Sequence, residues 1–127
     1  IEGGVSQNGE MTTGGEYDPR NKDVIYRGYL KKQRKIKGQW HDRWFVLTSN
    51  SLTYYKSSVE FHPLGFIPLL DCRVQLSDER RGFGFQINTP HKTYFLVAMD
   101  PLERNNWMQW IREVAKFLVA KRAEESG

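Results

Sequence analysis

The sequence predicts a mainly β fold in which seven antiparallel strands are capped by one C-terminal α-helix. Short runs of aromatic and β-branched residues follow one another with turn residues between them, and only the last segment has helical spacing. Strands without intervening helices pair as antiparallel neighbours, because a parallel pair needs a long crossover. The predicted strands span residues 24–33, 40–47, 52–56, 65–69, 73–76, 82–88 and 93–99.

The two ends of the chain differ in composition from its middle. Residues 1–23 are rich in Gly, Ser, Thr and Asn and have no hydrophobic period, which predicts a disordered tail, part of it typical of an expression remnant. Of the 127 residues 39% are hydrophobic, which is enough for one core. We therefore expect a single domain at residues 24–122, followed by a C-terminal tail at 123–127.

One amphipathic helix is predicted to begin at Pro101. Asp100 is a suitable N-cap, proline suits the first helical position, and Glu103 completes a capping box. Apolar residues then recur at spacings of three and four, as expected for a helix that packs one face on the core. The predicted buried stripe comprises Trp107, Trp110, Ile111, Val114, Phe117 and Leu118.

A basic segment at residues 31–43 is the strongest indication of function. Between residues 27 and 56 there are eight Lys and Arg and one acid, a charge of 8 − 1 = +7; the whole chain has +4, so the remainder has 4 − 7 = −3. This asymmetry predicts a basic face that meets an anionic partner. Three of the cations lie in the predicted loop between the first two strands: Arg34, Lys35 and Lys37.

Strand alternation directs further polar side chains of three strands toward that loop. His41 and Arg43 share one face of their strand, because successive side chains point to opposite sides. By the same rule, Lys32 in the strand before and Tyr54 in the strand after lie at the same open end of the sheet. Cationic donors and a hydroxyl in this arrangement suit a ligand with several phosphate groups.

Taken in order, these segments resemble a known family. The runs GYLKKQ, WHDRWFVL, LTYYK, PLGFIPL and YFLVAMDPLERNNW, with the closing helix, are similar to pleckstrin homology (PH) domains. The resemblance covers residues 24–120 and depends on several features in the right order, each of them weak alone. It implies the fold of that family, a seven-stranded antiparallel barrel-like sandwich capped by a C-terminal α-helix.

The resemblance also implies a phosphoinositide-headgroup site between the first two strands. Lys32 matches the first lysine of the family's binding pattern, Arg43 its final arginine, and Tyr54 a third-strand tyrosine that contacts phosphate. Three positions depart from the cationic residues of tight binders: Gly38, His41 and Leu64. The departures predict moderate affinity and leave the preferred phosphoinositide open.

Membrane recruitment follows from the same resemblance. We expect a monomeric cytoplasmic module that binds phosphoinositide headgroups and anionic membrane surfaces peripherally, since no apolar run reaches the roughly 18 residues of a membrane span. Ile36, between two lysines of the loop, is a candidate for insertion into the headgroup boundary, and packing within the loop is equally compatible with its position. The alternative function is a protein–protein interaction module of the same fold with weak or no lipid binding. Its candidate surfaces are the outer face of the helix, the turn at 78–81, and Trp40 with Trp44.

Other classes of function lack their motifs in this sequence. No Gly-rich phosphate loop, nucleophile motif or pair of carboxylates indicates an enzyme. The aromatic residues form no stacking row of the kind that binds nucleic acid. The His and Cys residues lack metal-ligand spacing, so neither a metal nor a cofactor is expected. The one cysteine, Cys72, is expected to lie in a buried strand as an unreactive thiol.

Overall fold

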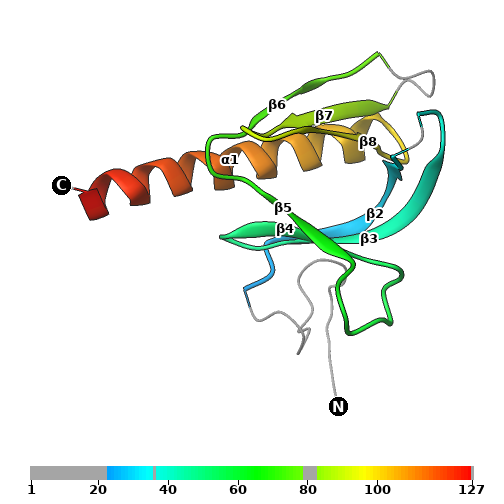
Figure 1. Ribbon diagram of the computed structural model, residues 1–127, viewed down its shortest axis with the longest axis horizontal. Coiled ribbons are helices and arrows are strands. Elements are labelled where there is room, and N and C mark those ends of the chain that lie inside the picture. Colours follow the sequence, from blue (N-terminus) through cyan, green and yellow to red (C-terminus); the bar gives the residue numbers. More distant parts are fainter. Residues whose placement is uncertain (1–22, 36, 79–82, 127) are drawn as a thin grey trace.

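The computed structural model describes residues 23–35, 37–78 and 83–126, in which seven strands form one antiparallel sheet and a single α-helix follows them (Figure 1). The strand order in the sheet is β5-β4-β3-β2-β8-β7-β6. This arrangement confirms the predicted fold class. The elements are β2 (Tyr26–Gln33), β3 (Trp40–Leu47), β4 (Ser51–Tyr55), β5 (Gly65–Pro68), β6 (Arg73–Leu76), β7 (Gly84–Asn88), β8 (Thr93–Val97) and α1 (Pro101–Ser126).

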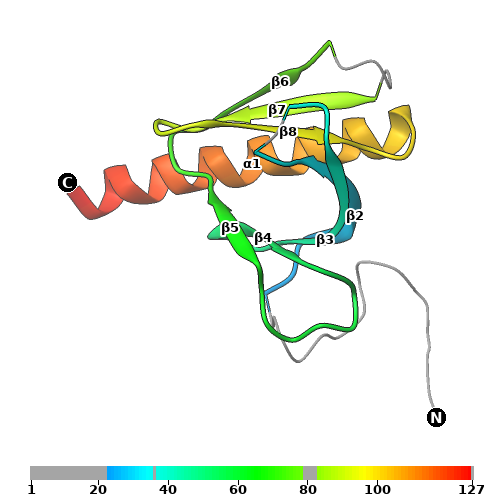
Figure 2. The ribbon, with the colours of Figure 1, turned by 45° about the vertical axis from the view of Figure 1, so that its right-hand side comes forward.

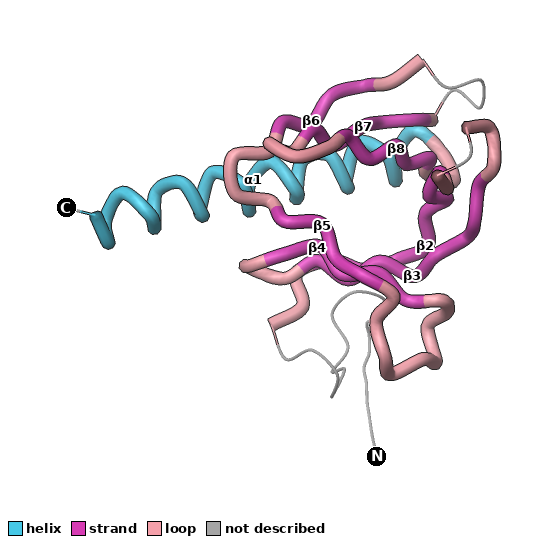
Figure 3. Tube along the Cα trace, viewed as in Figure 1, coloured by secondary structure: helices cyan, strands magenta, loops and turns pink. Residues whose placement is uncertain are grey.

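The sheet bends so that the first and last of its strands along the chain are neighbours. β2 pairs with β8 at two positions, Lys31↔Val97 and Lys32↔Leu96, and with β3 along its whole length. Figures 1 and 2 show β6, β7 and β8 on one side and β2 to β5 on the other. α1 contacts β6 and β7 and runs along that side of the molecule (Figure 3).

The boundaries of most predicted elements differ from those of the structure by one or two residues, whereas the strands predicted at 40–47 and 73–76 coincide with β3 and β6. The run predicted at 82–88 begins as β7 at Gly84, and residues 79–82 lie outside the described part of the chain. α1 continues past residue 122 to Ser126, into the segment that the sequence predicts as a tail. Of the tail predicted at 1–23, residues 1–22 also lie outside the described part of the chain.

Apolar side chains from both sides of the sheet and from α1 form one core. The alternation predicted from the sequence accounts for Phe45, Leu47, Leu52 and Ile67, which point inward, whereas Val46 and Tyr55 are buried on the opposite face of their strands. The largest fully buried side chains are Trp107, Phe45, Phe85, Leu30, Leu47, Leu52, Ile67, Leu69, Ile87, Leu96, Ile111 and Val46. Trp107 lies edge-on to Tyr26, with ring centroids 4.8 Å apart, so α1 is held against the start of β2.

The start of α1 is capped as the sequence predicts. The backbone N–H of Glu103 donates to Oδ1 of Asp100 at 2.8 Å, which satisfies one of the free N–H groups of the first turn. The carboxylate of Glu103 accepts a hydrogen bond from the Tyr26 hydroxyl at 3.0 Å. The cap and this bond position the helix over the Tyr26 end of β2, opposite the Lys32 end.

The predicted buried stripe of α1 is wrong at two positions. Trp110 and Phe117 are exposed, whereas Met108 and Ala115 are buried beside Trp107, Ile111 and Val114. With about 100° between successive residues, Trp110 and Phe117 lie along one margin of the stripe. The helix packs through the opposite margin, so these two aromatic rings remain at the surface.

The sequence predicts that Cys72 lies in a buried strand, but the structure places it in the turn between β5 and β6. It is half-buried, and burial raises the pKa of its thiol to about 11. In the same turn, Asp71 has a φ of 64° and accepts two hydrogen bonds from the Arg122 guanidinium, at 2.7 and 3.0 Å. These bonds attach the C-terminal part of α1 to the turn.

Candidate functional site

The pairing of β2, β3 and β4 determines which polar side chains lie together. The register sets Lys32 opposite His41 and Phe45 opposite Tyr54, so three neighbouring strands direct these side chains to one end of the sheet. Arg43 lies two residues after His41 on the same face of β3. We call the cluster that these residues form with two residues of the β7–β8 hairpin the basic mouth: Lys32, His41, Arg43, Tyr54, Lys92 and Tyr94.

Lys32 lies at the centre of the basic mouth. Its Nζ is 4.9 Å from the ring centroid of Tyr54 and 5.9 Å from that of Tyr94, so the ammonium group lies between two aromatic faces. Burial, followed by the nearby charges of Lys92 and Arg43, lowers the pKa of Lys32. An anion between these cations would remove the repulsion that the free protein contains.

Lys92 and Tyr94 are members of the basic mouth that the sequence reasoning missed. Lys92 lies in the turn between β7 and β8, and its Nζ is 4.6 Å from the ring centroid of Tyr94. The β2–β8 pairing brings this turn beside the end of β2. Lys92, a basic residue at the tip of the last predicted hairpin, was the signal from which its role could have been found. Local patterns, however, do not show which strand is the neighbour of β8.

His41 and Arg43 contact each other within the basic mouth. A guanidinium N–H of Arg43 donates to Nδ1 of His41, which therefore has its lone pair on that nitrogen. A second Arg43 N–H donates to the backbone carbonyl of Asp42 at 2.9 Å. Partial burial and the charges of Arg43, Arg34 and Lys32 hold the pKa of His41 below its ordinary value, against the opposing charge of Asp42.

The phenol of Tyr54 lies across Gly65 of the next strand. A Cβ at Gly65 would be 2.6 Å from the Tyr54 hydroxyl oxygen and 2.9 Å from the ring carbon that bears it. The glycine therefore leaves the space in which the ring contacts Lys32. Burial and the neighbouring Tyr94 raise the pKa of Tyr54, while Arg43 opposes this shift.

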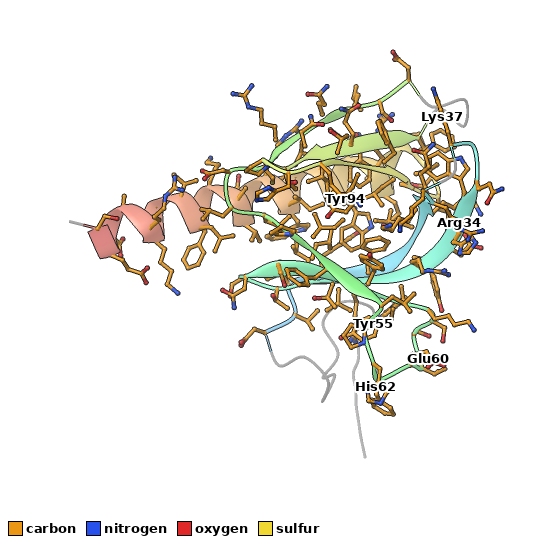
Figure 4. The ribbon with its side chains drawn as sticks, viewed as in Figure 1. Arg34, Lys37, Tyr55, Glu60, His62 and Tyr94 are labelled. Atoms are coloured by element: carbon orange, nitrogen blue, oxygen red, sulfur yellow. The ribbon has the colours of Figure 1, made fainter. Side chains whose placement is uncertain are left out.

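The loop between β2 and β3 closes as a short turn beside the basic mouth. Arg34 donates to Gln39 through its backbone N–H at 2.8 Å and through its guanidinium at 3.0 Å, and Gly38 has a φ of 88°. Lys35 and Lys37 are exposed, and Figure 4 shows Arg34 and Lys37 on the side away from the C-terminal end of α1. Ile36, the membrane-insertion candidate, lies outside the described residues.

The neighbouring residue Lys31 points to the opposite face of β2. Its Nζ forms an ion pair with Oδ1 of Asp42 at 2.8 Å. This pair lines a cavity of about 490 Å³ whose other walls are largely apolar. The cavity residues are Tyr29, Leu30, Lys31, Asp42, Phe83, Val97, Ala98 and Met99. With its one lysine already paired to a carboxylate, this cavity is poorly suited to phosphate.

Two of the predicted protein-binding residues are less accessible than the sequence suggests. Trp40 and Trp44 are half-buried, and the ring of Trp44 packs edge-on against Tyr29 with centroids 4.9 Å apart. The indole nitrogen of Trp44 is buried. The turn predicted at 78–81 is described only at Asp78, which is exposed.

The described part of the chain has neither a metal site nor a membrane-spanning helix. Within residues 23–35, 37–78 and 83–126, no cluster of three or more His, Cys, Asp or Glu side chains could hold a metal ion. In the same ranges, no helix is both long and apolar enough to cross a membrane.

Comparison with known proteins gives the same family over most of the chain. A family model described as "PH domain" matches residues 24–116. The chain is 41% identical over 106 residues to human pleckstrin homology domain-containing family A member 6. This alignment covers 78% of the chain and 10% of that protein. The chain is also 37% identical over 88 residues to a RAC family serine/threonine-protein kinase homolog of Dictyostelium discoideum, covering 68% of the chain and 20% of that protein. The chain thus spans a tenth to a fifth of the length of these relatives.

A solved structure of similar fold supports this assignment. The C-terminal PH domain of pleckstrin, crystallised in complex with D-myo-Ins(1,2,3,5,6)P5, superposes with a TM-score of 0.66 at 33% identity, over 72% of this chain and 95% of that one. The family match, the sequence identity and the shared fold agree over the strands and the helix. The chain therefore belongs to the PH domain family.

Proposed function

We propose that this domain binds phosphoinositide headgroups at the basic mouth and thereby recruits the protein that contains it to anionic membranes. The observation that supports this most directly is the convergence of Lys32, Arg43 and Lys92 on one spot, where burial and then the charges of Lys92 and Arg43 lower the pKa of Lys32. Such clustering costs free energy in the free protein, and a multiply charged anion offsets it. The inositol phosphate bound to the related pleckstrin domain has the corresponding chemistry.

We expect the affinity to be moderate. Each charge-assisted hydrogen bond to phosphate contributes about 1.5–3 kcal/mol, so the cations absent at Gly38, His41 and Leu64 weaken binding by about tenfold to a hundredfold each. Leu64 is exposed and lies in the loop immediately before β5, and His41 has a lowered pKa in the free protein. The cations that remain near the membrane add about 1 kcal/mol each, and salt screens this part of the binding.

Two adjacent lysines provide the test of this proposal. Lys32→Met removes the charge at the centre of the basic mouth, and Lys31→Met removes the same charge from the opposite face of β2, where it is paired with Asp42. The measurement is sedimentation with phosphatidylcholine vesicles containing a phosphatidylinositol bisphosphate, at low and high salt, together with calorimetric titration of soluble inositol hexakisphosphate. We expect Lys32→Met to weaken both by about tenfold to a hundredfold.

The matched variant separates a pocket from a diffuse charged surface. Lys31→Met is expected to leave the titration with soluble headgroup unchanged and to weaken vesicle binding by about fivefold at low salt only. A headgroup site at Lys32 would be contradicted if the two variants lost vesicle binding equally at low salt and neither differed from the unmodified domain at high salt. A panel of phosphoinositides at high salt then identifies the preferred headgroup.

An alternative role as a protein-interaction module rests on the two aromatic side chains that α1 exposes, Trp110 and Phe117. The double variant Lys32→Ala/Arg43→Ala distinguishes the roles in cells. Recruitment to membranes collapses in this variant if headgroups drive it, and it persists if a protein partner does. In the variant with glutamine at positions 110 and 117 in place of Trp110 and Phe117, recruitment persists if headgroups drive it and collapses if a protein partner does.

A further inference from the structure

A second surface lies beside the basic mouth and consists of apolar side chains. The loop at 56–64, between β4 and β5, and the start of β5 expose four large ones. Their exposed fractions are 76% for Val59, 69% for Phe61, 53% for Leu64 and 63% for Phe66. We call these four residues the apolar edge. So many exposed apolar side chains within residues 59–66 indicate an interaction surface.

The backbone connects the apolar edge directly to the basic mouth. The N–H of Leu64 donates to the carbonyl oxygen of Tyr54 at 2.9 Å, so the loop returns to the sheet at the residue whose ring contacts Lys32. Gly65, which follows, lies under the Tyr54 hydroxyl. Figure 4 shows two residues of this loop, Glu60 and His62, on the side away from the C-terminal end of α1. Arg34 and Lys37, from the loop between β2 and β3, lie on the same side.

Hydrogen bonds hold the loop in a defined position relative to the sheet. The N–H of Ser58 donates to the Tyr29 hydroxyl on β2 at 3.0 Å, and the N–H of Glu60 donates to the carbonyl oxygen of Ser57 at 3.2 Å. Leu64 lies in the bend immediately before β5, and Phe66 lies within β5 opposite Thr53, so its side chain leaves the sheet on the side away from Tyr54. The apolar side chains are thus presented from an anchored backbone.

We propose that the apolar edge enters the interfacial region of the same anionic bilayer whose headgroup occupies the basic mouth. This inference rests on the proposed function. A bilayer surface offers anionic headgroups and, a few ångströms deeper, hydrocarbon, which matches a cationic cluster bordered by Phe and Leu side chains. Within the loop, Lys56 and Glu60 offset each other, so no net charge opposes insertion.

Position distinguishes the apolar edge from the aromatic side chains exposed on α1. Phe117 and Val119 are exposed too, but they lie on the C-terminal half of the helix, which extends away from the strands of the basic mouth (Figure 1). A membrane bound at Lys32 would reach the apolar edge beside Tyr54 and would not reach Phe117. These two residues therefore provide a control pair of similar chemistry.

The test compares two double variants in vesicle binding. Val59→Gln/Phe61→Gln removes one aliphatic and one aromatic side chain from the apolar edge, and Phe117→Gln/Val119→Gln removes a matched pair from α1. Vesicles contain phosphatidylcholine, phosphatidylserine and a phosphatidylinositol bisphosphate, and soluble inositol hexakisphosphate is titrated in parallel. We expect the first variant to bind vesicles about tenfold to a hundredfold more weakly with unchanged affinity for the soluble headgroup.

Each outcome supports or overturns a particular statement. The α1 variant should bind vesicles and the soluble headgroup like the unmodified domain, and an equal loss of vesicle binding in both variants overturns the inference. Unchanged vesicle binding by Val59→Gln/Phe61→Gln also overturns it, and assigns the apolar edge to another kind of partner. If the unmodified domain binds neither vesicles nor the soluble headgroup, the proposed function itself fails.

A fluorescence measurement reports insertion without relying on affinity. Phe61→Cys in a Cys72→Ala background allows labelling of the loop with an environment-sensitive nitrobenzoxadiazole group, and Phe117→Cys in the same background is the control. The emission of the loop label should shift to the blue and increase on addition of vesicles, whereas the label on α1 should not respond. A loop label that stays in water while the domain is bound would overturn the inference.

Discussion

The environment of His41 predicts a pH dependence of headgroup binding. In the free protein, partial burial and then the cations Arg43, Arg34 and Lys32 hold the pKa of His41 below its ordinary value, and Nδ1 accepts a hydrogen bond from Arg43. A phosphate group in the basic mouth replaces repulsion by attraction and raises that pKa. Protonation also ends the acceptor role of Nδ1, which frees the Arg43 N–H for phosphate.

The sign and size of the effect follow from linkage. Between the lowered pKa of the free protein and the raised pKa of the complex, binding takes up one proton, so affinity increases as the pH falls through this interval. One proton changes the affinity by at most about tenfold per pH unit. Below the pKa of the free protein and above that of the complex, His41 contributes no slope.

The assay is calorimetric titration of soluble inositol hexakisphosphate between about pH 5.5 and pH 8 at constant ionic strength. The phosphate groups of the ligand titrate in the same range, so the unmodified domain is compared with His41→Gln. His62→Gln, an exposed histidine in the loop at 56–64, is the matched control. Affinity slopes that are equal for the unmodified domain and His41→Gln would refute the reasoning, as would a loss of slope in His62→Gln.

Three further predictions concern folding, geometry and reactivity. Trp107→Ala should lower the free energy of unfolding by about 3–5 kcal/mol in urea denaturation, because it empties the space between α1 and β2, and a loss under about 1 kcal/mol would contradict this. Gly65→Ala should displace the Tyr54 ring and weaken headgroup binding while far-ultraviolet circular dichroism stays unchanged; undiminished binding would show that the ring position is unimportant. The Cys72 thiol, with a pKa of about 11, should react slowly with Ellman's reagent near neutral pH and rapidly in denaturant, whereas fast native labelling would contradict its burial.

Most of the basic mouth could be predicted from local sequence patterns. Alternation along a strand fixes the relative directions of Lys32, His41, Arg43 and Tyr54, and short connections make their strands neighbours. The capping of α1 by Asp100 is equally local, because it needs only residues of the first turn.

What the sequence did not predict depends on contacts between distant segments. Lys92 and Tyr94 belong to the basic mouth because β8 pairs with β2, and no local pattern specifies that pairing. The helical period indicated Trp110 and Phe117 as core, but the rotation of a helix against a sheet follows from the packing of both partners. The apolar edge was missed because exposed Phe and Leu residues in a loop have no periodic pattern to distinguish them from core.

The two register pairs between β2 and β8 have a consequence for the dynamics of the domain. Lys32, whose side chain is at the centre of the basic mouth, also provides one of the two backbone positions at which the sheet closes between these strands. Separation of β2 from β8 would move Lys32 away from Tyr94, so a ligand that needs both must favour the closed junction. Slower amide exchange in the bound state would then extend along β8 to backbone groups that the ligand never touches.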